Sequence, residues 1–328
     1  MHLRKHSRFS SLLSAAALAL IATGAQAQGS EWPTKTVELV IPQGPGGGTD
    51  VLGRLWAKHV GKALGGNVVV MNKAGANGIM ASSYVAKKEP DGYTILLTGV
   101  SYLAVNPAIY PSLSYDPKKD FAGVALLTST PFMLTASTAS GLKTFDQFVA
   151  AGKAATPQLT FASAGKGNST HLVMEMLKAR LGLDLLHVPY TGGRLALAVM
   201  SGEVDVAANV MNTVLAPVHN GQVNALAVIG ANRSKNFPNV PTLQELGVKD
   251  FPLPGWYALV APANTPRPII DRINAETQKF LADPEIRKTL LELDLEPLPG
   301  PPEAVGEWIN RDAGIWGEFI RANNLQNN

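Results

Sequence analysis

The feature of this sequence that most constrains the fold is a strand, a glycine-rich turn and a helix that follow one another near the N-terminus. The β-branched run Val37–Ile41 is stopped by Pro42, and Gly46-Gly47-Gly48 follows. Helical periodicity then runs over Val51–Leu64. Glycines let backbone N–H groups approach a ligand, and the start of a helix attracts negative charge. The segment therefore predicts an anion site at the end of a strand.

Residues Gly48-Thr49-Asp50 narrow the choice of anion. A Walker-type loop has Gly-Lys-Ser/Thr here, and Asp50 places a carboxylate where that lysine would contact phosphates. Nucleoside triphosphates are therefore not predicted as ligands. Thr49 or Asp50 is expected to cap the helix. Because a carboxylate ligand would be repelled by it, Asp50 is predicted to belong to the motif without touching the ligand.

The order of strand, glycine loop and helix recurs, which predicts an α/β fold with parallel strands. Because right-handed crossovers bring the carboxyl ends of parallel strands to one edge, the loops should meet in a ligand crevice there. The later strands are expected at Asn67–Met71, Thr94–Thr98, Leu159–Ala162, Leu185–Val188, Val204–Ala208 and Ala225–Ile229.

Two groups of such units predict two lobes joined by two crossings. Lobe 1 is expected to comprise residues 28–126 and 254–328, including three C-terminal helices, and lobe 2 residues 127–253. The crossings are expected near 122–137 and 253–260. This arrangement suggests a hinged protein that closes over a ligand.

The first 27 residues have the pattern of a secretory signal peptide. Arg4, Lys5 and Arg8 form a basic region, Leu12–Ile21 is apolar but too short to span a bilayer, and Ala25-Gln26-Ala27 is a cleavage site. The mature chain is expected to begin at Gln28 and to act outside the cytoplasmic membrane, in a bacterial periplasm.

Composition excludes several classes of function. The chain has 28 Lys and Arg against 25 Asp and Glu, but three of the basic residues lie in the signal, so the mature chain is neutral. A neutral chain does not predict nucleic acid as a partner. The absence of cysteine from the sequence excludes disulfides and thiolate metal sites. No cofactor or metal is predicted.

The glycine loops and their flanking residues carry a resemblance to a known family. The chain resembles a Bug-type receptor, the periplasmic solute-binding component of tripartite tricarboxylate transporters, over essentially all of the mature sequence. The motifs are Pro42-x-x-Pro45-Gly46-Gly47-x-x-Asp50, Asn72-x-x-Gly75-Ala76-x-Gly78, Asp91-Gly92-Tyr93-Thr94, Gly165-x-Gly167-x-Ser169-Thr170-His171, Pro189-Tyr190-x-Gly192-Gly193, Gly202-x-Val204-Asp205, and Gly255-Trp256 followed by Ala261-Pro262-x-x-Thr265-Pro266.

This resemblance implies a flytrap fold with two parallel-rich sheets flanked by helices and a ligand cleft between the lobes. It implies a carboxylate held by backbone groups, hydroxyls and ordered waters, and a membrane permease as partner of a monomeric receptor. The candidate ligand-binding residues are Pro45, Gly46, Gly47, Gly48, Thr49, Gly75, Ala76, Ser163, Ser169, Thr170, His171, Tyr190, Arg194 and Asn209. Asp50, Asn72, Gly78, Gly192 and Asp205 are predicted to have structural roles in the motifs.

Three candidates have competing interpretations. The hydroxyls of Ser169 and Thr170 are preferred as ligands over His171, which a structural hydrogen bond could equally explain. Tyr190 could pack its ring in the core with its hydroxyl toward the cleft. Arg194 stands where family members usually carry a small residue; it is either a solvated first-turn residue or a bidentate clamp for a carboxylate.

The competing functional class is an α/β hydrolytic enzyme. Ser169 and His171 are only two residues apart, and the sequence has neither a G-x-S-x-G elbow nor an H-E-x-x-H metal motif. The chain is therefore predicted to be a receptor for a mono- or dicarboxylate, aromatic or aliphatic. Delivery to a different transporter or to a sensor kinase stays open as an alternative.

Overall fold

The computed structural model describes residues 32–154, 156–190, 194–251 and 255–326. Lys35–Asn328 form one compact unit, and the fold described below lies within it. The predicted signal peptide, Gly192 and the start of the second crossing lie outside the described residues.

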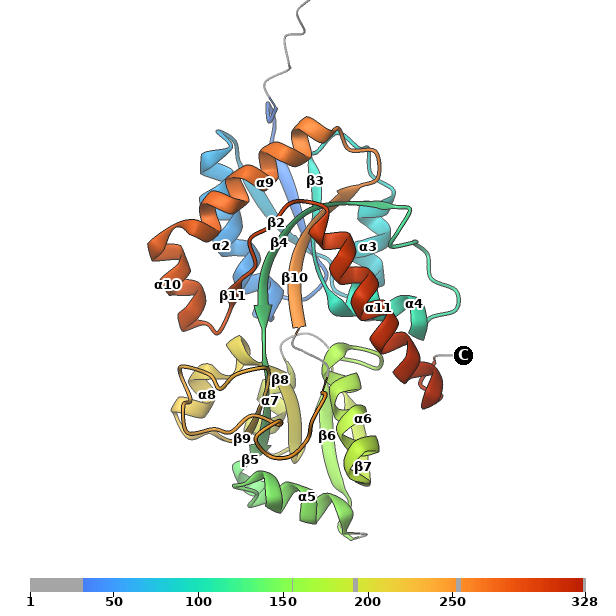
Figure 1. Ribbon diagram of the computed structural model, residues 1–328, viewed down its shortest axis with the longest axis vertical. Helices are drawn as coiled ribbons and strands as arrows, with labels where there is room; N and C mark the ends of the chain where they lie inside the picture. The colour runs from blue at the N-terminus through green and yellow to red at the C-terminus, as the bar shows by residue number, and fades with distance from the viewer. Residues whose placement is uncertain (1–31, 155, 191–193, 252–254, 327–328) are drawn as a thin grey trace, which may run out of the picture. The chain divides into compact units, whose positions relative to one another are not determined.

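The first sheet has six strands in the order β11-β4-β10-β3-β1-β2 (Figure 1). Strands β1, β2 and β3 pair in parallel, whereas β10 is antiparallel to β3 and β4, and β11 is antiparallel to β4. The bounds are β1 Val37–Ile41, β2 Val68–Asn72, β3 Thr94–Gly99, β4 Phe121–Thr130, β10 Gly255–Pro262 and β11 Glu296–Pro297.

The second sheet has five strands in the order β7-β6-β8-β5-β9. Strand β6 is parallel to β7 and β8, and β5 is antiparallel to β8 and β9. The bounds are β5 Phe132–Ser137, β6 Leu159–Ser163, β7 Leu185–Pro189, β8 Val206–Val210 and β9 Val223–Ile229.

Helices flank both sheets. The C-terminal helix α11 packs against β4 and α4, and α9 packs against α2 and β4 (Figure 1), so the C-terminal helices belong with the first sheet, as predicted. The helices are α2 Gly48–Ala63, α3 Ile79–Ala86, α4 Asn106–Ile109, α5 Phe145–Lys153, α6 Ser169–Leu181, α7 Arg194–Met200, α8 Leu215–His219, α9 Arg267–Ala282, α10 Pro284–Glu292 and α11 Ala304–Ala322. Short helical turns are η1 Ala76–Gly78, η2 Ser101–Val105, η3 Thr138–Ser140 and η4 Met211–Thr213.

The predicted fold class is confirmed, with one refinement. Both sheets are mixed, because the strand that follows each crossing, β5 or β10, runs antiparallel to the repeated units. Strand β4 ends in the first sheet at Thr130 and β5 begins in the second at Phe132, so the first crossing is at Pro131. The short elements α8 and β11 were not predicted, since five and two residues show no periodicity.

Tryptophans anchor helices to the first sheet. Trp56 on α2 is fully buried and donates to Thr277 Oγ1 on α9 at 3.0 Å. Trp256 on β10 donates to Asp312 Oδ2 on α11 at 2.6 Å, and Asp312 is itself buried. Because each buried indole N–H has an acceptor, these large side chains add apolar burial without leaving an unpaired donor.

The pairing directions place the glycine loops at one edge of each sheet, where the parallel strands have their carboxyl ends. In the first sheet, β1 and β3 end where β10 begins, because β10 is antiparallel to β3. In the second, β6 and β8 end where β5 begins. The chain crosses between these two edges at Pro131, so the glycine loops of both sheets lie close to the crossing.

Thr144 is the N-cap of α5 and forms a capping box with Gln147. Its Oγ1 accepts from the Gln147 N–H at 3.2 Å, and Gln147 Oε1 accepts from the Thr144 N–H at 3.2 Å. Thr144→Ala should therefore lower the free energy of unfolding by about 1 kcal/mol. Thr144→Ser keeps the cap oxygen and should cost much less. Urea titrations measure both, and equal losses would contradict this role of the cap.

Candidate functional site

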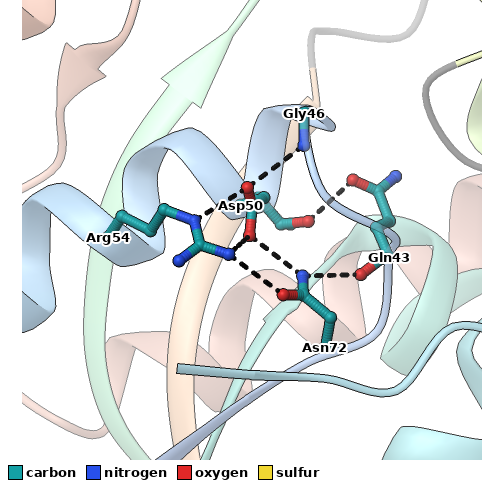
Figure 2. Close-up of polar contacts among 6 residues, drawn as sticks. Gln43, Gly46, Asp50, Arg54 and Asn72 are labelled. Atoms are coloured by element: carbon teal, nitrogen blue, oxygen red, sulfur yellow. Dashed lines mark hydrogen bonds and ion pairs between the residues drawn. The ribbon is translucent and has the colours of Figure 1, made fainter. Parts of the chain in front are cut away.

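The carboxylate of Asp50 organises the first glycine loop (Figure 2). It accepts from the Gly46 N–H at 3.1 Å, from Arg54 Nε at 3.0 Å and from Asn72 Nδ2 at 2.9 Å. The same Asn72 nitrogen donates to the Gln43 carbonyl at 2.9 Å, so the loop is tied at both ends to β2 and α2. Burial acts to raise the pKa of Asp50, but these hydrogen bonds outweigh it and lower that pKa.

The capping prediction for Thr49 and Asp50 was wrong. The helix begins at Gly48, three residues earlier than predicted, and its N-cap is Gly47, which has no side chain to accept a hydrogen bond. Both residues therefore lie inside the first turn. Thr49 donates to Gln43 Oε1 at 2.7 Å, and Asp50 turns back to Gly46.

The backbone donors that remain for a ligand are those of two of the four candidate residues Gly46, Gly47, Gly48 and Thr49. The Gly46 N–H is donated to Asp50, and the Gly47 N–H points to the Gly44 carbonyl at 3.4 Å. Gly48 and Thr49 begin α2, and no described residue accepts from their N–H groups. The available donors thus lie two residues further along the chain, at the first turn of a 16-residue helix.

Two polar side chains surround Gly48. A Cβ placed on Gly48 would lie 2.4 Å from Tyr257 Oη on β10 and 3.1 Å from Asn212 Oδ1 on η4. Both side-chain polar atoms of Asn212 are buried and have no partner among the described residues. Burial raises the pKa of Tyr257, so its hydroxyl is a neutral donor. The Gly48 position thus brings together polar groups of both sheets.

The glycine loop of the second sheet uses its own N–H groups internally. The Ala164 N–H is donated to Thr170 Oγ1 at 2.9 Å, and the Gly165 N–H to Ser163 Oγ at 3.1 Å. Asn168 is the N-cap of α6 and accepts from the Thr170 N–H at 3.1 Å. Ser169 is buried, and its N–H is donated to Ser101 Oγ, which follows β3 of the first sheet, at 3.0 Å.

Two neutral histidines hold this loop. His171 Nδ1 accepts from the Gly167 N–H at 3.2 Å, and Ser163 Oγ lies 2.6 Å from His187 Nε2. The two rings are 4.1 Å apart, centre to centre. Burial lowers the pKa of His171 to about 3 and that of His187 to about 4, with further lowering from nearby lysines. Each ring can therefore act as an acceptor near neutral pH.

The central cavity lies where the two sheet edges meet. It contains about 740 Å³ of empty space, counting its opening to solvent. The first sheet contributes Gln43, Gly46, Gly48, Gly99, Val100, Ser101, Tyr102, Thr130, Gly255, Trp256 and Tyr257. The second contributes Phe132, Ala164, Asn168, Ser169, Thr170, Leu195, Ala196, Val210 and Thr213. None of these lining residues carries a positive charge.

A side cavity of about 790 Å³, counting its opening to solvent, lies next to the central one. The two share Gln43, Tyr102, Ala164 and Asn168 as a common wall. Gly75, Ala76 and Gly78 line the side cavity, so the second glycine loop faces this space. Asn77 of the same loop accepts from Asn168 Nδ2 at 3.1 Å, which joins the loops of the two sheets.

The structure therefore divides the predicted site residues into groups. Those that line the central cavity are Gly46, Gly48, Ser169 and Thr170. Those that line the side cavity are Gly75, Ala76, Gly78 and Tyr190. Pro45 is exposed, while Gly47, Thr49, Ser163 and His171 lie behind the loops that they support.

Three further residues lie away from both cavities. Asn209 is buried and donates to Thr135 Oγ1 at 2.8 Å. Asp205 accepts from the N–H and hydroxyl of Thr160, both at 2.7 Å, and so joins β8 to β6. Arg194 is exposed, with its guanidinium 6.0 Å from the centre of the Tyr190 ring. In this position the guanidinium can stay hydrated while it contacts the face of the Tyr190 ring. The structure does not bring Arg194 to the central cavity.

Sequence reasoning missed several residues of the cavity. Ser101 follows a strand that was predicted correctly, so its place at the sheet edge was a signal that could have found it, whereas Tyr257 lies on β10, which was not predicted as a strand. Gln43 comes two residues after the end of the predicted strand Val37–Ile41, and that position was a second signal. Phe132 had no local signal, because its position depends on pairing with Val210, 78 residues away in sequence.

No helix in the described part of the chain is both long and apolar enough to cross a membrane. Among the same residues, no group of three or more His, Asp or Glu side chains could hold a metal ion.

Comparison with known proteins gives consistent matches. The family model for the tripartite tricarboxylate transporter family receptor matches residues 52–325. Protein BugT of Bordetella pertussis is 32% identical over 293 residues, which cover 88% of this chain and 90% of BugT. The structure of R. palustris Rpa4515 with adipate has a TM-score of 0.86 and 28% identity, covering 88% of this chain and 97% of that one. The periplasmic binding protein BugD has a TM-score of 0.85 and 30% identity, covering 90% and 99%.

The histidine pair predicts how stability depends on pH. The pKa of His171 is about 3 in the folded protein, against an ordinary value of 6.5, so the unfolded chain binds a proton first as pH falls. Stability should therefore be fully present above pH 6.5 and decrease below it. The slope from this group approaches about 1.4 kcal/mol per pH unit.

Urea titrations between pH 7.5 and 4.5 measure this slope. His171→Asn keeps a possible acceptor for the Gly167 N–H but removes the titrating ring, so its stability should vary less with pH. His59→Gln, on the exposed face of α2, is the control. Equal slopes for the wild type and His171→Asn would contradict the prediction.

Proposed function

The chain belongs to the family of tripartite tricarboxylate transporter receptors, and from this membership we propose that it captures a small organic carboxylate and delivers it to the permease of such a transporter. The chain is a receptor and not an enzyme. The carboxylate that it captures would bind in the central cavity, between the Gly48 loop and the second sheet.

One observation carries this proposal: unpaired donors from both sheets converge on Gly48. They are the N–H groups of Gly48 and Thr49, the hydroxyl of Tyr257 and the amide of Asn212, whose Oδ1 lies nearest to Gly48 and whose donor Nδ2 is also unpaired. A carboxylate accepts up to four hydrogen bonds, and it would satisfy an amide that is otherwise buried without a partner. The positive end of α2 adds to the attraction without a fixed cation. The adipate-bound relative supports a carboxylate as the ligand class.

Capture would proceed by closure of the two lobes. The proposed lobes are residues 28–126 with 254–328 and residues 127–253, with the end of β4 extending the first lobe to Thr130. Gly48 and Tyr257 come from the first and Asn212 from the second, so a ligand that contacts all three stabilises their approach. Ligand binding shifts a population only through contacts that differ between the two states, and Asn212 supplies such a contact. The monomeric receptor would then present the closed form to the permease.

The proposed location is the periplasm, in agreement with the location of BugD. Export would use residues 1–27 as a signal peptide and leave Gln28 as the first residue of the mature protein. Intact-mass measurement of protein recovered from the periplasm checks this. A mass that includes the first 27 residues would contradict cleavage at Ala27.

Delivery to a different transporter or to a sensor kinase is the alternative. Capture of the solute would be identical in that case, because the two alternatives differ only in the membrane protein that binds the closed receptor. The family membership favours the tripartite permease.

Two glycines of one loop test the binding site. Gly48→Ala would place a Cβ 2.4 Å from Tyr257 Oη and close to Asn212, so it should weaken carboxylate binding at least about tenfold. Gly44→Ala is the matched control, because a Cβ there meets nothing within 4 Å. Calorimetric titration with carboxylates that stabilise the wild type measures both variants. Equal affinities for the two variants would contradict the location of the site.

A further inference from the structure

The polar groups of the central cavity are distributed unevenly. The free donors gather around Gly48, at the edge of the first sheet. Two further hydroxyls of the cavity lining are already committed: Thr213 Oγ1 donates to the Val210 carbonyl at 2.7 Å, and Thr130 Oγ1 to the Pro131 carbonyl at 3.3 Å. A hydroxyl whose hydrogen is already donated in a hydrogen bond presents only its lone pairs to a ligand, and these repel a carboxylate.

The wall around these hydroxyls is apolar. Phe132 and Val210 are direct partners in the antiparallel pair β5 and β8, so their side chains lie next to each other. The Phe132 ring reaches the first sheet, where it would lie 3.4 Å from a Cβ on Gly255. Leu195 and Ala196 of α7 complete this apolar wall, which consists of Phe132, Leu195, Ala196 and Val210.

We propose that the solute is a carboxylate with a single charged head and an apolar body. The head binds at Gly48, Thr49, Tyr257 and Asn212, and the body lies against the apolar wall. This inference rests on the proposed function and specifies its ligand class.

Electrostatics gives the reason for a single charge. A carboxylate at the apolar wall would lose its hydration and find hydroxyls that present only acceptors. The described lining residues contain no Lys, Arg or His to compensate for the second charge. An aliphatic chain or an aromatic ring, in contrast, gains from leaving water in the same place.

Asn212 is the specificity-determining residue on the second sheet. Its Nδ2 and Oδ1 are both buried without a hydrogen-bond partner among the described residues, and Nδ2 can donate to the carboxylate head. Asn212→Asp has nearly the same shape but puts a negative charge beside the head. It should abolish carboxylate binding, whereas an amide that only packed against Gly48 would tolerate the change better.

The matched pair hexanoate and adipate tests the ligand class, because the two differ only in the second carboxylate. Benzoate and terephthalate form a second pair with a ring as body. Calorimetric titration of the wild type should show the monocarboxylate of at least one pair binding about tenfold more tightly than its dicarboxylate. Tighter binding of the dicarboxylate in both pairs would overturn the inference and leave the proposed function intact.

Two valine substitutions test the apolar wall itself. Val210→Thr adds a hydroxyl opposite Phe132 with little change in volume and should lower affinity for the better monocarboxylate about tenfold. Val69→Thr makes the same exchange on β2, where Val69 is 47% exposed, and should leave affinity unchanged. Equal effects of the two substitutions would overturn the inference.

The remaining outcomes are also decisive. If the dicarboxylates bind better and Arg194→Ala removes that preference, the solute has two charges and Arg194 is the clamp that the sequence suggested. If a folded wild type binds none of the four acids, both the ligand class and the proposed capture of carboxylates are wrong.

Discussion

The ion pair between Asp50 and Arg54, together with the bond from Asn72, is the interaction on which the first glycine loop depends (Figure 2). Arg54 is more than half exposed, so the pair alone contributes little to stability. Its importance is geometric. By accepting the Gly46 N–H, Asp50 fixes the turn that leads into α2 and leaves the N–H groups of Gly48 and Thr49 as the free donors. The buried carboxylate of Asp50 thus shapes the start of α2, where we propose that the ligand carboxylate binds, without contacting that ligand.

The glycine loops of the two sheets are held in place by different kinds of side chain. A charged residue holds the loop of the first sheet, whereas neutral His171 and the Ser163–His187 pair hold that of the second. In both, most loop N–H groups are consumed by the protein itself. The glycine loops are thus rigid supports, and selectivity rests on the few donors that remain. Such preorganised donors bind an anion without the cost of reorganising the loop.

Carboxylate capture without a cationic side chain is physically reasonable here. A cation in the cavity would bind tightly but would also have to be desolvated on closing, and release to a permease would be slow. The first turn of a 16-residue helix, a tyrosine and an amide provide weaker, directional contacts. Bonds of this kind keep affinity moderate and make it sensitive to the position of Asn212, which couples binding to the approach of the second sheet.

The sequence by itself determined the repeated strand, loop and helix units, their α/β class, the Thr144 cap and the membership of a receptor family, because these depend on local periodicity, glycine placement and motif order. It also predicted a shared crevice for Gly48, Ser169 and Thr170, which all line the central cavity. Only the tertiary structure decided which loop N–H groups are free, because hydrogen bonds to Asp50 and His171 consume the others. The meeting of Asn212 with Gly48, and of Phe132 with Val210, likewise depends on pairings between distant residues that no local pattern records.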